Sequence, residues 1–564
     1  MLSVKVAYLA SAASRAISNR VNSRKFVIVS AYSCLHCPVS QTRFYQSVAA
    51  PEETVIRIPR SMQKQVENVK QTRGKNKINT VRAGKLLIQS KYPDLNQTGA
   101  YTLGRFEQPV LSSKGWKHNK SFGDYFTINN MRTVAPCVAE NQNEEVEKEA
   151  AVTFNNLHIC KELVETLEKI GITNPTTVQL QTIPKVMKGH NILCAAETGS
   201  GKTLSYLLPI IQRLKADKES EMYAQGAHKI GAVVIVPSRE LAEQVAAVSR
   251  GLCAQLGLRT MTVGGGRGVG HIKEVFKKDH PDILVATPGA LVKALRRRCI
   301  DLTDLSFFVV DEADTMFDPS FSDMLENILV KTNISSDPKE TKGLDHKAQL
   351  LVVGATFPGG VGEVLSKVTD LGSMVVIKSK MLHFLMPHVK QKFLKLKGAD
   401  KILELNQALK LQQEEGGGAA LVFCNKSVTV NWLGYSLDEM GVKHARLHGN
   451  MPAAMRAGIF RSFQKGSADV LVCTDIASRG LDTSRVRLVV NYDSPESHTD
   501  YIHRAGRVGR AGGMEGGEVL TFVTHMWDVE LVQKIETAAR RRTSLPGMES
   551  EIREPKPKES STEE

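Results

Sequence analysis

The sequence predicts an α/β protein with two domains in tandem, each a parallel sheet flanked by helices. Three observations carry this prediction: a length of 564 residues, two series of short apolar runs that alternate with helical stretches, and polar segments that flank these series. A chain of this length exceeds what one hydrophobic core usually organises. Apolar runs that alternate with helices are typical of βαβ units, which build parallel sheets.

The first series predicts a domain over residues 151–376. Its buried strands are expected at "NILCAA", "GAVVIVPS", "DILVATP", "LSFFVVDEAD" and "QLLVVGAT". The second series predicts a domain over 392–540, with strands at "AALVFCN", "HARLHG", "DVLVCTD", "RLVVNYD" and "GEVLTFV". Residues 377–391 are then the interdomain linker. The Pro-rich, charged end of the chain predicts a disordered tail over 541–564.

The beginning of the chain has the composition of a targeting segment. Residues 1–50 contain no Asp or Glu, are rich in Ser and Ala, and carry spaced arginines. This composition is typical of an organellar transit peptide, with a plain disordered tail as the alternative. Its apolar runs are short and interrupted by charge, so no membrane span is expected.

The excess positive charge of the chain is N-terminal. Residues 1–132 hold 21 Lys and Arg against 6 Asp and Glu, which equals the net charge of +15 for the whole chain. We expect 51–150 to be a basic, largely disordered extension. It is either a solvated arm or a segment that binds the phosphates of a nucleic acid, and both interpretations stay open. The cluster "KQTRGKNK" at 70–77 could also act as a nuclear signal.

The cysteines give no reason to expect a structural metal. Cys34 and Cys37 form a CxxC pair, but no second pair follows at zinc-finger spacing, and the pair lies in the predicted transit peptide. The remaining cysteines are expected to be reduced thiols, mostly in the core.

A phosphate-binding loop is predicted at "AAETGSGKT", between a strand and a helix. Glycine lets the backbone approach phosphate oxygens, and successive N–H groups at a helix start hold the anion. Lys202 is expected to contact the β- and γ-phosphates and to be catalytic, and the Thr203 hydroxyl to ligate Mg²⁺. The residues expected to bind the nucleotide here are Ala196, Glu197, Thr198, Gly199, Ser200, Gly201, Lys202 and Thr203.

An acidic pair follows a second apolar strand, in "FFVVDEAD". Carboxylates at the carboxyl end of a parallel strand lie where such sheets bind ligands. We expect Asp311 to hold Mg²⁺, directly or through water. Glu312 is expected to orient and deprotonate the attacking water, which makes it catalytic.

Further motifs occur in a fixed order around these two. They are "GITNPTTVQ", "PSRELAEQ", "TPG", "VFCN", "LHGNMPAAMR", "TDIASRGLD" and "HRAGRVGR". With the P-loop and "DEAD", they resemble the DEAD-box RNA helicases of superfamily two over about 154–540. The resemblance implies two RecA-like domains, the helicase ATP-binding domain first and the helicase C-terminal domain second, with ATP and Mg²⁺ as cofactors and RNA as partner.

The resemblance implies specific roles in the first domain. Phe154 and Gln179 would bind the adenine, since an amide can read its N6 and N7 together, which favours ATP over GTP. Small residues and N–H donors would contact the RNA backbone without reading its sequence. These RNA-contacting residues are Pro237, Arg239, Gly265, Gly266, Thr287, Pro288 and Gly289.

In the second domain the resemblance places both RNA and ATP contacts. Asp482 would touch ATP, and Arg507 and Arg510 would clamp the γ-phosphate as catalytic arginines. Hydrolysis would then require the domains to close, so ATP and RNA would each tighten the binding of the other. The implied RNA contacts are Asn425, Arg456, Thr474 and Arg479.

Three positions depart from the family pattern. Ala290 replaces an Arg, Ala453 a Gln, and Gly354 the Ser of a Ser-Ala-Thr motif that links ATP hydrolysis to strand separation. The first two are expected to weaken the grip on RNA, and the third to change coupling. The residues assigned to coupling are Asp314, Gly354, Thr356 and His503.

The resulting prediction is an ATP-dependent RNA helicase that locally unwinds or remodels structured RNA. Close likeness to a mitochondrial member implies a mitochondrial location, in the matrix, an RNA granule or the nucleoid, with the nucleus as a possible second site. It also implies ribosomal RNA and large-subunit precursors as partners. Alternatives are an ATP-gated RNA clamp and a granule scaffold with little turnover.

Overall fold

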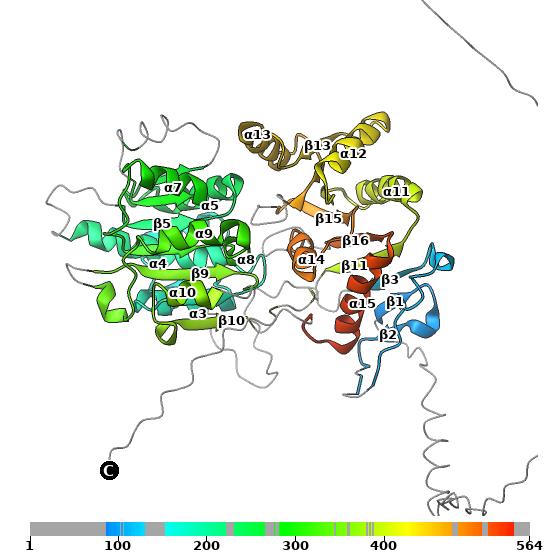
Figure 1. The fold of residues 1–564 in the computed structure, drawn as a ribbon, viewed down its shortest axis with the longest axis horizontal. Helices are drawn as coiled ribbons and strands as arrows, with labels where there is room; N and C mark the ends of the chain where they lie inside the picture. Colours follow the sequence, from blue (N-terminus) through cyan, green and yellow to red (C-terminus); the bar gives the residue numbers. More distant parts are fainter. Residues whose placement is uncertain are drawn as a thin grey trace, which may run out of the picture. The chain divides into compact units, whose positions relative to one another are not determined.

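Two sheets and their helices make up the structure (Figure 1). The computed structural model describes residues 86–101, 103–104, 107–129, 153–220, 230–264, 276, 281–342, 346–357, 361–379, 382, 385, 389–475, 483–509 and 517–545. The predicted transit peptide, 1–50, lies outside the described residues.

The first sheet is the core of the predicted ATP-binding domain. Its seven strands run parallel in the order β10-β4-β9-β8-β5-β7-β6. The strand that ends in Gly354 therefore lies between the strand before the P-loop and the strand before Asp311. The strands are β4 (Ile192–Ala195), β5 (Ala232–Ile235), β6 (Thr260–Val263), β7 (Ile283–Ala286), β8 (Phe307–Val310), β9 (Gln349–Gly354) and β10 (Val375–Lys378).

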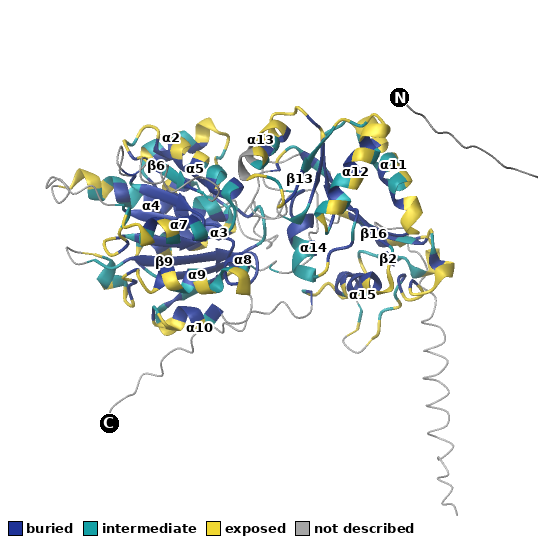
Figure 2. Cartoon of the chain, turned by 45° about the horizontal axis from the view of Figure 1, so that its top comes forward, coloured by how far each residue is buried: buried dark blue, intermediate teal, exposed yellow. Residues whose placement is uncertain are grey.

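Helices cover both faces of this sheet because successive strand residues point to opposite sides. Ile192 and Cys194 of β4 join one apolar core, and Leu193 and Ala195 join the other. Figure 2 shows the buried strands inside and exposed residues on the outer helix surfaces. One core contains α2 (Lys161–Lys169), α3 (Thr177–Met187), α4 (Lys202–Glu219) and α5 (Arg239–Cys253), and the other contains α7 (Pro288–Arg296), α8 (Ala313–Met316), α9 (Pro319–Leu329) and α10 (Val361–Ser366). Short 3₁₀ turns are η3 (Phe154–Leu157), η5 (Pro338–Thr341) and η6 (Leu371–Ser373).

The second sheet begins as the predicted parallel sheet and continues beyond it. Six strands run parallel in the order β13-β14-β12-β15-β16-β11. They are β11 (Lys390–Lys395), β12 (Ala419–Phe423), β13 (His444–Leu447), β14 (Val470–Cys473), β15 (Val486–Asn491) and β16 (Glu518–Val523). The helices are α11 (Lys401–Glu414), α12 (Ser427–Glu439), α13 (Ala453–Gln464), α14 (His498–Ala505) and α15 (Met526–Arg541), with η7 at Gly398–Asp400. The predicted fold class is confirmed.

Three strands of the N-terminal extension complete this sheet. β3 (Tyr125–Ile128) pairs antiparallel with β11, and β1 (Leu86–Ser90) and β2 (Gln97–Thr98) follow outward. The expectation of a largely disordered extension is therefore wrong for residues 86–129. Polar composition hid the few apolar residues that matter: Phe126 stacks on Phe393 at 4.8 Å, and Trp116 is 1% exposed. Short turns in this segment are η1 (Pro93–Leu95) and η2 (Asn119–Ser121).

A buried ionic cluster fastens the extension to α15. The Glu536 carboxylate, 0% exposed, accepts hydrogen bonds from the N–H groups of Ser112 and Ser113 at 2.7 and 3.0 Å. It also accepts a hydrogen bond from the Arg540 guanidinium at 2.8 Å. Arg540 in turn donates a hydrogen bond to the Leu95 carbonyl. All charges and donors of this cluster have partners, which is the condition for burying an ion pair.

Two further boundaries differ from the sequence prediction. The expected linker, 377–391, contributes its first residues to β10 and its last to β11. The expected tail contributes Arg541 to α15 and a buried Leu545, at 1% exposure. The rest of that tail, 546–564, lies outside the described residues. Among the described helices, none has both the length and the apolar character needed to cross a membrane.

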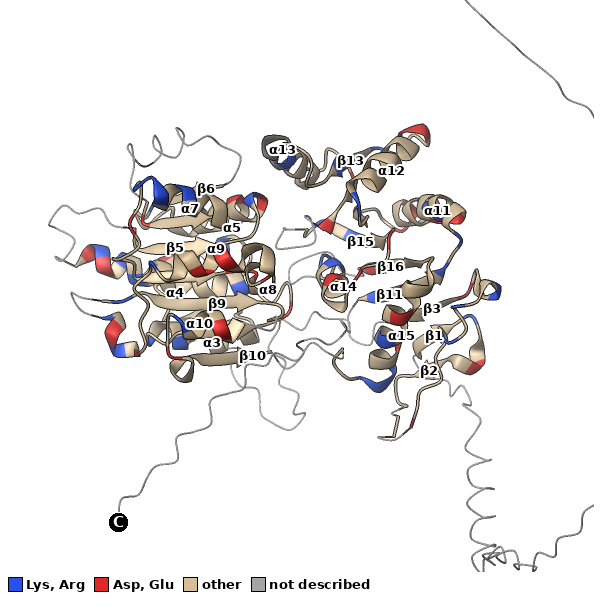
Figure 3. Cartoon of the chain, viewed as in Figure 1, with Lys and Arg blue, Asp and Glu red and all other residues tan. Residues whose placement is uncertain are grey.

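Charged residues avoid the strands that form the first sheet. Strands β4, β5, β7, β8 and β9 contain none, and Figure 3 shows the charges on helices and loops. Buried parallel strands have this composition because both faces are covered.

Replacing Glu536 tests whether the extension is part of the folded second domain. Glu536→Ala leaves buried N–H groups and the Arg540 charge without a partner, which should lower the free energy of unfolding by about 3–5 kcal/mol. Chemical denaturation of the full chain measures this. The control is Glu530→Ala, which breaks an exposed pair with Lys117 at 3.1 Å and should cost under about 1 kcal/mol. Equal, small effects would contradict the structural role.

Candidate active site

The P-loop connects β4 to the first turn of α4, as the sequence predicts. Gly199 and Gly201 both have φ of 82°, a left-handed conformation that only glycine adopts at little cost. A Cβ on Gly201 would lie 2.5 Å from the Gln179 amide nitrogen. The close turn therefore requires glycine for two reasons, backbone angle and space.

Lys202 is held within this loop. Its Nζ donates to the carbonyls of Ala196 and Glu197, both at 2.8 Å, and the residue is 8% exposed. The ammonium group thus stands in the loop expected to receive the phosphates. Thr203, the predicted Mg²⁺ ligand, follows it and is half-buried. Of the other loop residues, Ser200 donates its hydroxyl to the Glu197 carbonyl at 2.7 Å.

The predicted adenine reader is bonded to the P-loop. The Gln179 side-chain oxygen accepts from Thr176 N–H at 2.9 Å, and its amide nitrogen donates to the Gly201 carbonyl at 3.1 Å. Reading adenine would require at least one of these bonds to exchange. If Gln179 reads adenine as predicted, these bonds would link the base site to the phosphate loop. Phe154, its predicted companion, is 1% exposed in η3 and packs in the core.

Asp311 follows β8 and lies in a buried polar setting. Its carboxylate accepts from the Tyr206 hydroxyl at 2.9 Å and from Glu312 N–H at 2.8 Å. Burial, with the neighbouring Glu312 charge second, raises the pKa of Asp311 from 3.8 to about 6. A dication would reverse that penalty by favouring the ionised carboxylate, and carboxylate and hydroxyl oxygens are ligands that Mg²⁺ accepts. Asp311 and Thr203 thus have suitable chemistry for this ion.

Glu312 lies in a strained backbone conformation. Its φ of 53° is left-handed, which is uncommon for a residue with a side chain. The residue is 6% exposed, and its Oε2 atom has no hydrogen-bond partner among the described residues. A buried carboxylate oxygen without a partner suits a group that must accept a proton from water.

Residues assigned to coupling come together around the acidic motif. His503 of α14 forms an ion-pair contact with Asp314, and ligand atoms of Glu312, Asp314 and His503 lie within 4.8 Å of one another. Asp314 follows a strand of the first sheet, and His503 precedes the arginines of the second domain. Thr356, 7% exposed, follows the end of β9. The contact connects the acidic motif of the first domain to α14 of the second domain.

The predicted arginine-finger loop lies against the P-loop. A Cβ added to Gly506 would overlap the Thr198 hydroxyl, so this approach requires glycine. Next to it, Arg507 is fully buried, and its Nε donates to the His503 carbonyl at 3.0 Å. Arg510 and Asp482 lie outside the described residues.

Arg504 organises the second domain's side of the site, although the sequence analysis did not assign it a role. It is 1% exposed and pairs with Asp475 through two bonds of 2.6 and 2.7 Å. It also donates to the Asn425 side-chain oxygen and the Asp493 carbonyl. The sequence signal that could have found it is the acidic Asp475 just after the β14 strand, which needs a basic partner once partly buried. Tyr206, the partner of Asp311, was missed because its α4 position looks like ordinary core.

The predicted RNA contacts of the first domain lie at strand ends. Arg239 opens α5, and a Cβ on Gly264 would meet its side chain at 2.7 Å, so glycine makes room for the arginine stem. Thr287 caps α7 and Pro288 starts it, while a Cβ on Gly289 would meet no atom within 4 Å. Pro237 is half-buried after β5. Gly265 and Gly266 lie outside the described residues.

Several residues of the second domain that are predicted to contact RNA form hydrogen bonds or ion pairs with other residues of the chain. Asn425 accepts from Arg504 and donates to the Ser494 carbonyl at 3.0 Å, so its amide positions the loop. Arg456 lies 3.5 Å from the buried carboxylate of Glu240 in the first domain. Thr474 N–H donates to the Leu447 carbonyl. Arg479 lies outside the described residues, as does the Ala453 side chain. Ala290, at 3% exposure, is a core residue.

A P-loop, an acidic strand end and a buried arginine loop, held by two RecA-like domains, define a helicase-type ATPase. A family model described as DEAD/DEAH box helicase matches residues 176–364, and one described as helicase conserved C-terminal domain matches 400–512. The chain belongs to the DEAD/DEAH box helicases. It is an RNA-dependent ATPase and RNA helicase.

Similar proteins cover most of the chain. Proteins named probable ATP-dependent RNA helicase DDX28 from Mus musculus and Homo sapiens are both 49% identical to it, over 89% and 91% of this chain and 93% and 95% of their own. Dbp5 of S. cerevisiae, solved with RNA and ADP BeF3, has 23% identity and a TM-score of 0.56, covering 69% of this chain and 93% of Dbp5. Mss116p, solved with ssRNA and AMP-PNP, has 23% identity and a TM-score of 0.59, covering 67% and 76%.

The raised pKa of Asp311 predicts a pH dependence for the protein without metal or nucleotide. Between about pH 4 and pH 6 the folded state binds a proton that the unfolded state has lost, so the free energy of unfolding falls as pH rises. Asp311→Asn should remove about 2–3 kcal/mol of this fall. The free energy of unfolding is measured by chemical denaturation from pH 4.5 to 7, in steps of about half a pH unit, with excess chelator. Asp323→Asn, at an exposed aspartate, is the control and should leave the pH profile unchanged.

Gly354 predicts a separable effect on coupling. A Cβ there would lie 3.1 Å from Ala313 Cβ and 3.1 Å from the Thr356 carbonyl, so a side chain needs a small local shift. Gly354→Ser also adds a hydroxyl, which can form a bond of roughly 0.5–1.5 kcal/mol near the acidic motif. It should change strand displacement per ATP more than RNA-stimulated hydrolysis. Gly354→Ala supplies the Cβ without the hydroxyl, and an equal effect of both variants on both activities would reject the prediction.

Proposed function

We propose that this helicase acts in mitochondria, where it remodels ribosomal RNA during assembly of the large ribosomal subunit. The observation that carries the location is the N-terminal segment 1–50, which lacks acidic residues and contains spaced arginines. The target is supported by the likeness of the helicase core to a mitochondrial member of the family. Recognition of one RNA among many would fall to flanking segments or partner proteins.

In this proposal, Thr203 and Asp311 would hold Mg²⁺, which would supply positive charge to the phosphates when bound. Glu312, whose Oε2 is buried without a partner among the described residues, holds and deprotonates the attacking water. Lys202 contacts the phosphates from the first domain, and Arg507 contacts them from the second. Because these groups come from two domains, hydrolysis depends on their closure.

The ATP-gated clamp remains the second candidate, and a specific observation favours it. The ion-pair contacts between His503 and Asp314, and between Arg456 and Glu240, join the two domains. Contacts of this kind stabilise a closed form, which would suit a protein that holds RNA for longer than one turnover. A granule scaffold would use the same closed form.

The Glu312→Gln variant distinguishes a helicase that depends on ATP turnover from an ATP-gated RNA clamp. The substitution keeps the shape of the side chain but removes the base, so ATPase activity should fall at least about 100-fold while ATP-dependent RNA binding persists. If remodelling is the function, cells with only this variant should accumulate large-subunit precursors. Normal assembly with the variant would contradict turnover as the function and support the clamp.

Location and target need their own measurements. A reporter fused to residues 1–60 should enter mitochondria, and a cytosolic reporter would contradict the transit peptide.

Crosslinking the protein to RNA in isolated organelles, followed by sequencing, should recover large-subunit ribosomal RNA. Recovery of messenger or transfer RNA in its place would contradict the proposed target.

A further inference from the structure

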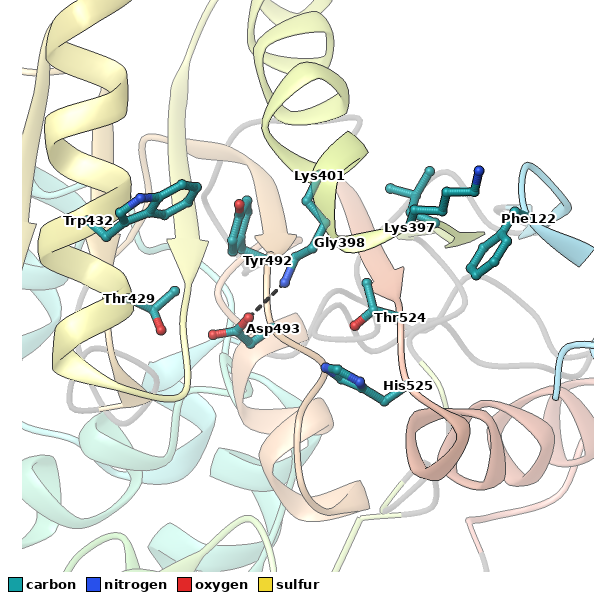
Figure 4. A pocket seen from close by; sticks show the side chains of 11 residues that line it. Phe122, Lys397, Gly398, Lys401, Thr429, Trp432, Tyr492, Asp493, Thr524 and His525 are labelled. Atoms are coloured by element: carbon teal, nitrogen blue, oxygen red, sulfur yellow. Dashed lines mark hydrogen bonds and ion pairs between the residues drawn. The ribbon is translucent and has the colours of Figure 1, made fainter. Parts of the chain in front are cut away.

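The second domain contains a pocket that none of the helicase motifs uses. Its volume is about 370 Å³, within the range of small-ligand sites. The loops after β11, β15 and β16 form its floor, and α12 forms one wall. The N-terminal extension supplies Phe122, so the site is complete only when that extension is folded on the domain (Figure 4).

Aromatic rings and lysines line this pocket. Trp432 is 52% exposed on α12, and the His525 ring is stacked on Trp527, itself 72% exposed, at 4.5 Å. Lys397 is exposed, and its Nζ lies 5.7 Å from the centre of the Phe122 ring. Rings that offer a face, beside an exposed cation, are the chemistry that binds a nucleobase and its phosphate.

The pocket continues the edge of the sheet on which the family's RNA contacts lie. Thr474 and Asn425 follow β14 and β12, and Asp493, His525 and Lys397 follow the next three strands in sheet order. Phe122 precedes the antiparallel β3, so it lies at the same edge. One carboxylate joins the two regions: Asp493 accepts from Asn425 N–H at 3.1 Å and from Lys401 Nζ at 2.8 Å.

We propose that this pocket binds a nucleotide of single-stranded RNA that extends beyond the core helicase contacts. The base packs against Trp432 and His525, and its phosphate pairs with Lys397. The carboxylate of Asp493 does not oppose this, because Lys401 and Asn425 already compensate its charge. The inference rests on RNA binding by the helicase core and adds a site to it.

RNA is favoured over a protein partner by the composition of the site. An exposed apolar stripe, the kind of surface that can bind a protein, lies on α12, where Val428, Trp432 and Tyr435 are 75%, 52% and 63% exposed at helical spacing. Only Trp432 of these lines the pocket. The pocket lining combines aromatic rings with two lysines and a histidine, and this composition suits a base and its phosphate better than an apolar protein face. Continuity with the RNA-contacting strand ends then decides the assignment.

The test compares a short RNA that covers only the core contacts with RNAs extended at the 5′ or 3′ end. Binding to the full chain is measured with a non-hydrolysable ATP analogue. One of the extensions should tighten binding to the wild type. Trp432→Ala should weaken binding of that extended RNA about five-fold to a hundred-fold, the effect of losing one stacked base. Lys397→Ala should weaken it less, and Trp432→Phe should retain most of the affinity.

Controls make the result specific. Affinity for the short RNA, and the ATPase activity that it stimulates, should stay unchanged in these variants. Tyr435→Ala, outside the pocket on the same helix, should behave as wild type. An unchanged affinity of Trp432→Ala for every extended RNA would overturn the proposal, as would an equal loss in Tyr435→Ala, which points to a protein-binding face.

A competition experiment distinguishes a nucleotide within RNA from a free mononucleotide as the occupant of the pocket. Uridine monophosphate, added at millimolar excess, should leave the gain from the extension intact. If it abolishes that gain while the short RNA stays bound, the pocket takes free mononucleotides and the proposal fails. If the wild type binds neither RNA, RNA binding by the core fails as well, which distinguishes that outcome from failure of the pocket alone.

Discussion

The whole arrangement depends on the fact that parallel strands bring all their carboxyl ends to one edge of a sheet. In the first sheet this places the P-loop, the acidic pair and Gly354 after three adjacent strands, β4, β8 and β9. In the second sheet it aligns Asn425, Asp493 and His525 in the same way. Chemistry therefore collects at two edges, and the bodies of the strands remain apolar. Each functional residue needs only the right position after its strand, which is why short motifs carry so much of the function.

Two domains are required in the proposed mechanism, because the groups expected to act on ATP are divided between two edges. Asp314 contacts His503, and Gly506 lies against Thr198, so the acidic motif and the P-loop each contact the arginine loop. The buried Arg504 then ties that loop to Asn425 and Asp475, on the side where RNA contacts are expected. A path of direct contacts thus leads from the phosphate loop to the RNA-facing strand ends. Movement of one end of this path is expected to disturb the other.

Sequence patterns were sufficient for both central sheets and for the positions of the P-loop and the acidic motif after their strands, since apolar strands and adjacent motif residues are local signals. They failed for β1, β2 and β3, whose stability comes from distant partners such as Phe393 and Glu536. They also gave no sign of the hydrogen bond from Gln179 to the Gly201 carbonyl, and the expected contact of Gln179 with adenine stays a prediction. Such roles depend on contacts between residues far apart in sequence, and no local pattern encodes them. The same limitation hid the pocket, because Phe122 and Trp432 meet only in the folded second domain.

If the ATP and RNA sites belong to one closed state, each ligand stabilises the binding of the other. The direct measurement is a thermodynamic cycle: RNA affinity with and without a non-hydrolysable ATP analogue, and analogue affinity with and without RNA. Linkage requires the same factor in both directions, on the order of 5–150-fold for a coupling of this kind. His503→Ala, which removes the contact to Asp314, should reduce that factor while leaving each ligand's affinity alone nearly unchanged. Two affinities that do not depend on the other ligand would contradict the account.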